Sequence, residues 1–308
     1  MIPYCYVDKR SYDRIGAPCR MREATLLWAD ALGRGPSKQT GHSLMFYESR
    51  REDDYCCTRY HYGSENQPIA PGDFSCDWDD KRWPEGTLAI HWVDEAKSGE
   101  SAEGRLGYMS YANNHQKDRH FVGLPDKSTV ADIAHELGHV LGMVHEHQRW
   151  DRDDHVEFRC RNLRGMREAV AEFRQTGLEY DQAWRILCTD FGAALHYTAP
   201  SRSYVKGDGL DAGMQPPLDG PGGFDMDSIM LYASKYASNA GEDKVDVDSA
   251  VLVGINKGPD GQKIPGSEFM IPERDKPSPL DAAFVSRFYP WDEAKYQEYR
   301  KQNQGAKP

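Results

Sequence analysis

The stretch Thr129–Asp153, TVADIAHELGHVLGMVHEHQRWDRD, places four histidines on a mostly apolar ribbon. A segment that reads as a buried helix rarely carries so many hydrogen-bonding groups. His135 and His139 are four residues apart, so on a helix they lie on one face and their imidazoles can converge on one point. The sequence therefore predicts a helix that begins near Ser128–Thr129 and presents a pair of metal ligands.

A third ligand is expected from the chain just after this helix. Gly142 follows His139 by three residues, and a residue that takes positive φ there lets the helix stop and the chain turn sharply. His145 then arrives from the turned segment. Three neutral imidazoles leave one coordination position open, which is the ligand arrangement of catalytic zinc sites. We predict one Zn²⁺ per chain, held by His135, His139 and His145.

An open zinc site is suited to hydrolysis, because bound zinc lowers the pKa of water to about 7 and polarises a scissile carbonyl. Glu136 can reach a bound water without being a ligand, and would pass the water proton to a leaving amine as general base. The sequence contains neither a GxSxG elbow nor a Gly-rich phosphate loop that would indicate other chemistry. The competing interpretation is a helix whose core histidines are satisfied without metal, but three His and one Gly at these offsets, together with Glu136, rarely arise by chance.

Two longer motifs carry a family resemblance. HELGHVLGMVHE, residues 135–146, fits the elongated zinc signature HExxHxxGxxHE, and HEHQRWDRD continues the likeness. FDMDSIMLY, residues 224–232, is similar to a Met-turn followed by a tyrosine. On these motifs the sequence resembles the metzincin peptidases and, through the Glu after the third His, the astacin family. The resemblance implies a zinc metalloendopeptidase that cleaves internal peptide bonds. The likeness reaches most of the chain more weakly, with residues 48–80 and 160–222 as departures.

The resemblance also implies roles for residues of the Met-turn. Met230 would form a hydrophobic floor under the zinc. Tyr232 would be an additional zinc ligand that swings away to hydrogen-bond the tetrahedral intermediate, since a phenol can donate to a developing oxyanion. Leu231 stands where the family usually has His, and His147 where it usually has Gln. We expect these two changes to alter pocket shape or hydrogen bonding without abolishing activity.

Glu146, the residue after the third His, has two interpretations. In the family, the ammonium group of the mature N-terminus folds inward and is bound near this Glu. Alternatively, Glu146 forms a salt bridge to Arg149 or Arg152 and supports the site structurally. The sequence leaves both open.

The expected fold is α+β and metzincin-like: a twisted N-terminal sheet with two helices, an irregular C-terminal lobe, and the zinc cleft between them. We expect a single peptidase domain over residues 1–296, with lobes at about 1–144 and 145–296, and a polar tail at 297–308. Strands are predicted at 1–8, 42–49, 86–95, 105–113 and 119–125, and helices at 19–35, 162–191 and 278–290. A peptide substrate is expected to add to an edge strand within 106–124.

The composition limits the classes of partner and the cellular compartment that are expected for this protein. The net charge is −11, which argues against nucleic acid or an anionic membrane as the main partner. No apolar run approaches the roughly 18 residues of a membrane span, and the first residues do not form a signal peptide. We expect a secreted protein that acts on protein or peptide substrates, with any signal peptide or pro-segment outside this chain. Its oligomeric state is not indicated.

Seven cysteines without paired CxxC motifs favour disulfides over a structural zinc knuckle. Cys160 and Cys188 flank a helical insert and are expected to staple it. The spacing also allows Cys56 or Cys57 to pair with Cys76, and Cys5 with Cys19. Reduced, buried cysteines in a cytosolic protein are the alternative.

Three alternatives to an astacin-like peptidase remain. A serralysin-like or reprolysin-like peptidase would replace Glu146, and the former would carry Gly-rich calcium repeats that this sequence lacks. A catalytically silent zincin used as a binding module would typically have lost Glu136. A zinc-stabilised structural protein would need a closed site of four ligands.

Overall fold

The computed structural model describes residues 1–16, 19–48, 55–60, 76–79, 81–84, 86–93, 102–104, 106–107, 120–206 and 222–302. The chain divides into two compact units, one of Met1–Met143 with Asp275–Pro308 and one of Val144–Arg274. In the described ranges, no helix has the length and apolar character needed to cross a membrane.

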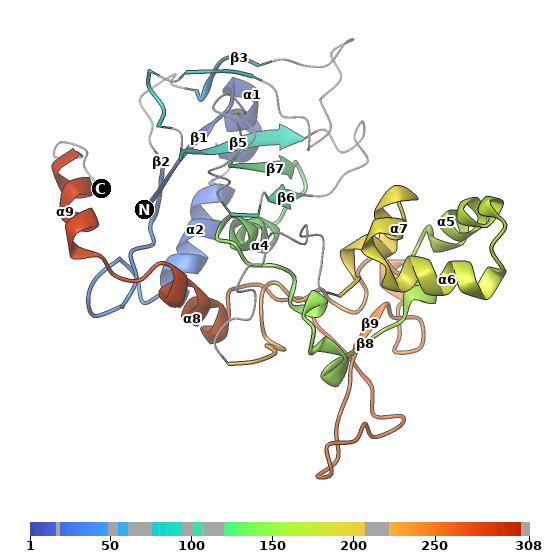
Figure 1. Cartoon of the computed structure of the whole chain (residues 1–308). Helices are drawn as coiled ribbons and strands as arrows, with labels where there is room; N and C mark the ends of the chain where they lie inside the picture. Colours follow the sequence, from blue (N-terminus) through green and yellow to red (C-terminus); the bar gives the residue numbers. More distant parts are fainter. Residues whose placement is uncertain are drawn as a thin grey trace. The chain divides into compact units, whose positions relative to one another are not determined.

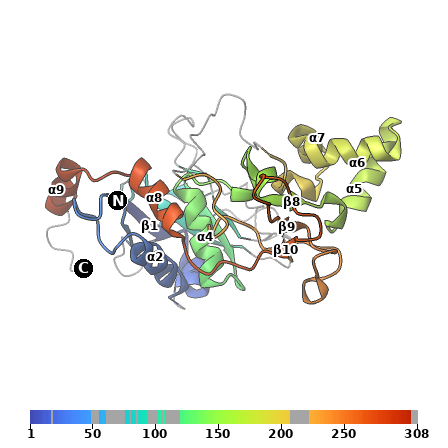
Figure 2. The same ribbon diagram turned by 90° about the horizontal axis from the view of Figure 1, so that it is seen from below.

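Most of the elements are labelled in Figure 1, and β10 is labelled in Figure 2. The α-helices are α1 (Lys9–Ser11), α2 (Arg20–Ala31), α4 (Val130–Val140), α5 (Met166–Phe173), α6 (Tyr180–Thr189), α7 (Phe191–His196), α8 (Pro279–Phe288) and α9 (Glu293–Gln302). The strands are β1 (Ile2–Tyr6), β2 (Phe46–Glu48), β3 (Cys57–Tyr60), β4 (Cys76–Trp78), β5 (Leu88–Val93), β6 (Glu103–Gly104), β7 (Phe121–Pro125), β8 (Val156–Phe158), β9 (Leu252–Gly254) and β10 (Phe269–Met270).

The first unit is built on a five-stranded sheet in the order β2-β1-β5-β7-β6. Strands β1, β2, β5 and β7 run parallel, whereas β6 pairs antiparallel with β7 at the edge. Every residue of β5 and β7 is buried, which is typical of parallel strands covered on both faces. The predicted N-terminal sheet is therefore present and mixed.

Helices α2 and α4 pack against each other, and α4 packs on β6 and β7 (Figures 1 and 2). The buried indole of Trp28 in α2 donates to the carbonyl of Ala134 in α4 at 2.9 Å. Helix α8 confirms the helix predicted at 278–290, with Ser278 as its cap and Pro279 as its first residue. Just after α8, the hydroxyl of Tyr289 donates to the carbonyl of Leu141 at 3.1 Å. The C-terminal part of the first unit thereby supports the end of α4.

The second unit combines the antiparallel sheet β10-β9-β8 with helices α5, α6 and α7. These helices surround a core of their own that includes Met166, Trp184 and Tyr204. The helical prediction over 162–191 is confirmed, with Gly177 in the left-handed region between α5 and α6 at a φ of 93°. Helix α7 adds a further turn beyond the predicted range.

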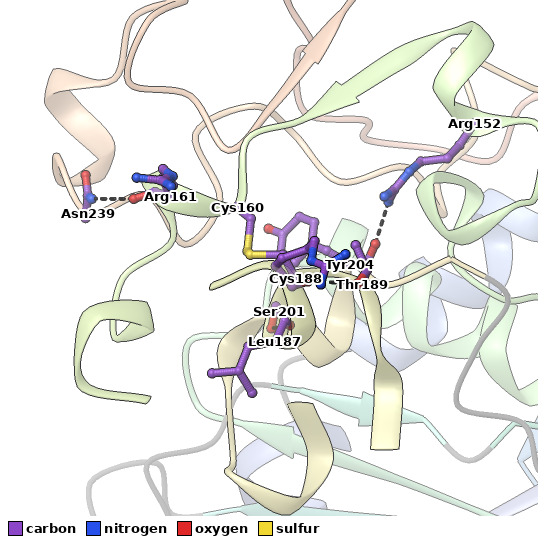
Figure 3. Close-up of a disulfide and its surroundings, with 10 residues drawn as sticks. Arg152, Cys160, Arg161, Leu187, Cys188, Thr189, Ser201, Tyr204 and Asn239 are labelled. Carbon is purple, nitrogen blue, oxygen red and sulfur yellow. Dashed lines mark hydrogen bonds between the residues drawn. A yellow bond between two sulfur atoms is a disulfide. The ribbon is translucent and has the colours of Figure 1, made fainter. Parts of the chain in front are cut away.

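The disulfides partly differ from those that the spacing suggested. Cys160 bonds to Cys188 and staples the helical insert, as predicted (Figure 3). Cys5 bonds to Cys56, so the expected Cys5–Cys19 pair is wrong, and of the two candidate partners for Cys76 the structure excludes Cys56. Strand β1 carries Cys5 into the core, where the chain that enters β3 meets it, whereas the thiol of Cys19 is exposed. Cys57 is also disulfide-bonded. Its expected pairing with Cys76 stays a prediction, because the side chain of Cys76 lies outside the described residues.

The α+β class is confirmed, with local differences. Most of the strand predicted at 105–113 lies outside the described residues, and the edge strand that is described, β6, precedes that range. The loop predicted at 206–223 also falls largely outside them. Helix α9 was not predicted, and it extends into the expected polar tail. Residues 275–308 belong to the first unit, and the organisation as one peptidase domain over 1–296 stays a prediction.

Candidate metal centre

Three histidines come together where the sequence places the metal ligands. One potential ligand atom from each of His135, His139 and His145 lies within 4.8 Å of the others, and all three side chains are half-buried. The rings of His135 and His139 are 5.0 Å apart between centroids, as expected for one helix face. Among the described residues, this is the group of histidine, cysteine and acidic side chains that could hold a metal ion.

Helix α4 fixes the first two ligands by defined caps at both ends. At its start, Thr129 and Asp132 form a reciprocal capping box. At its end, the amide of Gly142 donates to the carbonyl of His139 at 2.8 Å and that of Met143 to Gly138 at 3.0 Å. These two bonds are the Schellman arrangement, which requires a left-handed residue after the cap. Gly142 has a φ of 93°, so its predicted role in stopping the helix agrees with the geometry.

In a histidine that binds a metal through one ring nitrogen, the hydrogen bond of the second nitrogen fixes the tautomer. Nδ1 of His139 lies 2.8 Å from the carbonyl oxygen of Met143, and a carbonyl can only accept, so Nδ1 carries the proton and Nε2 is left for a metal. Burial, with a smaller contribution from His135, lowers the pKa of His139 to about 3. A neutral imidazole is the form that binds a metal. This set of three imidazole donors fits zinc.

Glu136 lies beside the ligands in a dry environment. Its side chain is buried, and this burial raises its pKa to about 8, against the opposing effect of a hydrogen bond from the backbone of Gly104. Gly104 is in β6, which packs on α4. A Cβ at Gly104 would lie 2.5 Å from the backbone oxygen of Glu136 and 3.0 Å from its carboxylate. Only glycine therefore lets the edge strand approach the carboxylate this closely.

Tyr232 lies among aromatic rings on the side of His145. Its ring centroid is 4.3 Å from that of His145, 4.4 Å from that of His147 and 4.7 Å from that of Tyr236. Met230 is fully buried, and its carbonyl accepts a hydrogen bond from the amide of Glu146 at 3.0 Å. The Met-turn thus bonds through its backbone to the loop after α4 that carries His145 and Glu146, the ligand loop.

Glu146 forms the salt bridge that was one of its two interpretations. Its carboxylate lies 3.3 Å from Nε of the buried Arg149 and accepts from the amide of Asp225 at 2.8 Å. Arg149 also makes a bidentate bond to Asp151, at 2.9 and 2.8 Å. Arg152 pairs with Asp153 instead. The ammonium group of Met1 donates to the carbonyl of Ser43.

Leu231 is a core residue. It is buried in an apolar cluster with Val156, Leu252 and Ile271. Its expected influence on the pocket would therefore act through packing of this cluster.

Two residues that hold site groups were not predicted. Gly104 was missed because a single glycine in a short strand carries no local signal for the helix that it touches. Gln148 bonds to Nδ1 of His145 at 2.9 Å, and it was missed because its other partner, the carbonyl of Val205 at 3.2 Å, lies 57 residues further along the chain, at the end of the helical insert. The spacing of Gln148 three residues after His145 was the available signal.

Comparison with known proteins identifies the region around the histidines. The model of the astacin peptidase family matches residues 107–210. Zinc metalloproteinase nas-34 of Caenorhabditis elegans is 28% identical over 86 residues, which are 26% of this chain and 13% of that protein. Bone morphogenetic protein 1 of Xenopus laevis is 33% identical over 95 residues, 28% of this chain and 13% of that protein.

A solved structure gives a longer but more distant match. The high choriolytic enzyme 1, a hatching enzyme zinc-protease from Oryzias latipes, is 15% identical with a TM-score of 0.44, over 94% of this chain and 88% of that one. The matched part of this chain spans 13–24% of the length of the curated relatives.

Proposed function

We propose that the chain is an astacin-family, zinc-dependent endopeptidase that hydrolyses internal peptide bonds of proteins, which the family match over residues 107–210 supports. The observation that carries the proposal is the convergence of His135, His139 and His145, with the buried carboxylate of Glu136 on the same helix as the first two. Three imidazoles leave a position open for chemistry. The Glu after the third His agrees with this family rather than with its serralysin-like and reprolysin-like cousins.

The reaction needs a proton acceptor next to the scissile bond. Zinc, when bound, would lower the pKa of water to about 7 and polarise the carbonyl. Glu136 accepts the proton of the attacking water and then delivers it to the leaving nitrogen. Its low-polarity surroundings suit this exchange, because burial raises the pKa of the carboxylate from its usual value into the range near neutral pH.

Tyr232 is proposed as the residue that steadies the oxyanion. Its ring lies against that of His145, so it is close to a ligand and can donate a hydrogen bond from the phenol. In the family it is also an additional zinc ligand. We expect Tyr232→Phe to lower kcat by about 10²–10³-fold, as removal of one oxyanion donor does elsewhere, with KM nearly unchanged. A rise in KM with kcat unchanged would assign Tyr232 to substrate binding instead.

The substrate is proposed to bind as an extended chain. Among the described residues, the sheet of the first unit ends in β6, which precedes the range 106–124 in which the edge strand was expected, and an added strand can pair there. The disulfides Cys5–Cys56 and Cys160–Cys188 support a secreted protein, because such bonds persist in oxidising compartments.

The test is cleavage of casein by the zinc-loaded protein and by Glu136→Ala, with zinc content measured on both. Exposed Glu168 at the start of α5 gives the matched control, Glu168→Ala. We expect one zinc per chain in all three proteins, with cleavage by wild type and Glu168→Ala that a chelator removes. Glu136→Ala should lose about 10²–10⁴-fold in rate, the usual contribution of a general base.

Two other outcomes would overturn the proposal. Zinc binding without cleavage by wild type would make the chain a catalytically silent binding module. Cleavage that survives in Glu136→Ala would show that another group accepts the proton.

A further inference from the structure

Gln148 connects the third histidine to a distant part of the second unit. Its Oε1 lies 2.9 Å from Nδ1 of His145, and its Nε2 donates to the carbonyl of Val205 at 3.2 Å. The side chain is half-buried. Replacing either bond by a bond to water would cost free energy, because both bonds are partly buried.

The two bonds together define the state of the His145 ring. The carbonyl of Val205 can only accept, so the amide nitrogen of Gln148 must face it and Oε1 must face His145. Nδ1 of His145 must then carry a proton and donate it. This leaves Nε2 unprotonated, which is the nitrogen that a metal needs. For His139 the same task falls to a backbone carbonyl four residues away.

The Val205 carbonyl belongs to a segment that holds the ligand loop at several points. The carbonyl of Ser203 lies 2.9 Å from Nε2 of the buried His147. The carbonyl of Tyr204 accepts from the guanidinium of Arg152 (Figure 3). The same guanidinium also donates to the carbonyl of His147 at 2.8 Å. Three successive backbone carbonyls, those of residues 203–205, thus hold the loop that carries the third ligand.

This segment is in turn fixed by the helical insert. Just before it, the hydroxyl of Ser201 donates to the carbonyl of Leu187 in α6. The residue after Leu187, Cys188, forms the disulfide with Cys160 (Figure 3). Tyr204 is buried in the core of the insert and stacks on Phe158 with ring planes 2° apart. The insert therefore presents residues 203–205 as a rigid edge.

We propose that Gln148 is a positioning residue, which holds His145 in its metal-binding tautomer and orientation by linking it to the disulfide-stapled helical insert. The insert then serves the metal centre as well as its own core. The proposal rests on the zinc site of the proposed function, and not on the identity of the substrate.

The experiment measures zinc affinity by competition with a chromophoric chelator, for the purified full chain. Gln148→Leu keeps the size of the side chain and removes both bonds. Partners that orient a ligating histidine are worth about 10–100-fold in metal affinity, and this loss is expected. Gln297→Leu, a change of an exposed glutamine in α9 that bonds to Glu293, is the matched control and should bind zinc as wild type does.

A double-mutant cycle separates positioning from general damage. In a His145→Ala background, Gln148→Leu should change zinc affinity by less than about twofold, because the residue through which it acts is gone. A loss of equal size in both backgrounds would overturn the proposal, as would a loss below about threefold in Gln148→Leu alone.

A second variant keeps the proposal falsifiable if Gln148→Leu folds poorly. Gln148→Glu retains an acceptor for the Nδ1 proton and should bind zinc more tightly than Gln148→Leu; equal weakness would contradict the proposal. Wild type that binds no zinc would refute the proposed function itself, whereas zinc-binding wild type with an unaffected Gln148→Leu refutes only this inference.

Discussion

Helix α4 and the loop after it supply ligands to the same site by different means. In α4, His135 and His139 are placed by helical spacing, and the caps at Thr129 and Gly142 are formed by neighbours in sequence. His145 follows the helix closely, but its neighbours His147 and Gln148 are held by residues 56–85 positions away, namely Ser203, Val205 and Tyr232. One part of the site is encoded locally, and the other depends on the completed second unit.

The largest expected effect tests whether the two kinds of ligand count equally. Zinc binding by four ligands is worth about 10–16 kcal/mol, so loss of one should weaken affinity by about 10²–10³-fold. We expect this loss for both His139→Ala and His145→Ala, measured by chelator competition. The exposed His196 at the end of α7 provides the control, since His196→Ala should bind as wild type does. A loss of under about tenfold for His145→Ala would remove it from the ligand set.

The next effect concerns the support of the loop. Replacing Cys160 and Cys188 by serine removes a disulfide that spans 28 residues of sequence, which should lower the free energy of unfolding by about 3 kcal/mol. Urea titration of the zinc-free protein measures this. Hydrogen exchange should also rise at the amides of residues 203–205 more than at those of α4. Equal exchange changes in both places would show that the insert does not support the loop selectively.

The smallest expected effect concerns the end of α4, which is encoded by residues close together in the sequence. Gly142→Ala should destabilise the protein by about 1–2 kcal/mol, the cost of a left-handed alanine, because Gly142 has a φ of 93°. A Cβ there would meet no atom within 4 Å, so the cost comes from the backbone conformation alone. Gly142→Asn should cost less, since asparagine tolerates this conformation. Thermal unfolding compares the three proteins. If alanine and glycine proved equally stable, the Schellman end of α4 would not depend on this glycine.

This comparison also explains which features could be read from the sequence. The three histidines, Glu136, the helix cap at Thr129 and the stop at Gly142 follow from spacing and from backbone rules over a few residues. The α+β class followed from strands such as β5 and β7, whose apolar runs are fully buried. Where only one partner was possible within the insert, as for Cys160 and Cys188, the pairing was also predictable.

The remaining features depend on which distant segments meet. Cys5 pairs with Cys56 because β1 and the entry to β3 come together, and spacing along the chain cannot show that. The contact of Gly104 with Glu136 requires β6 to lie on α4. Gln148 acquires its role only when the end of the insert returns to the ligand loop. No local pattern of residues distinguishes these positions from ordinary surface ones.

The most direct test of the zinc centre is X-ray absorption at the zinc edge of the metal-loaded protein. We expect three imidazole nitrogens with one or two oxygens at about 2.0–2.1 Å and no sulfur. A sulfur shell at about 2.3 Å would mean that cysteines bind the metal. A fit with two imidazoles would mean that His145 is held in place by its long-range contacts for a purpose other than binding zinc.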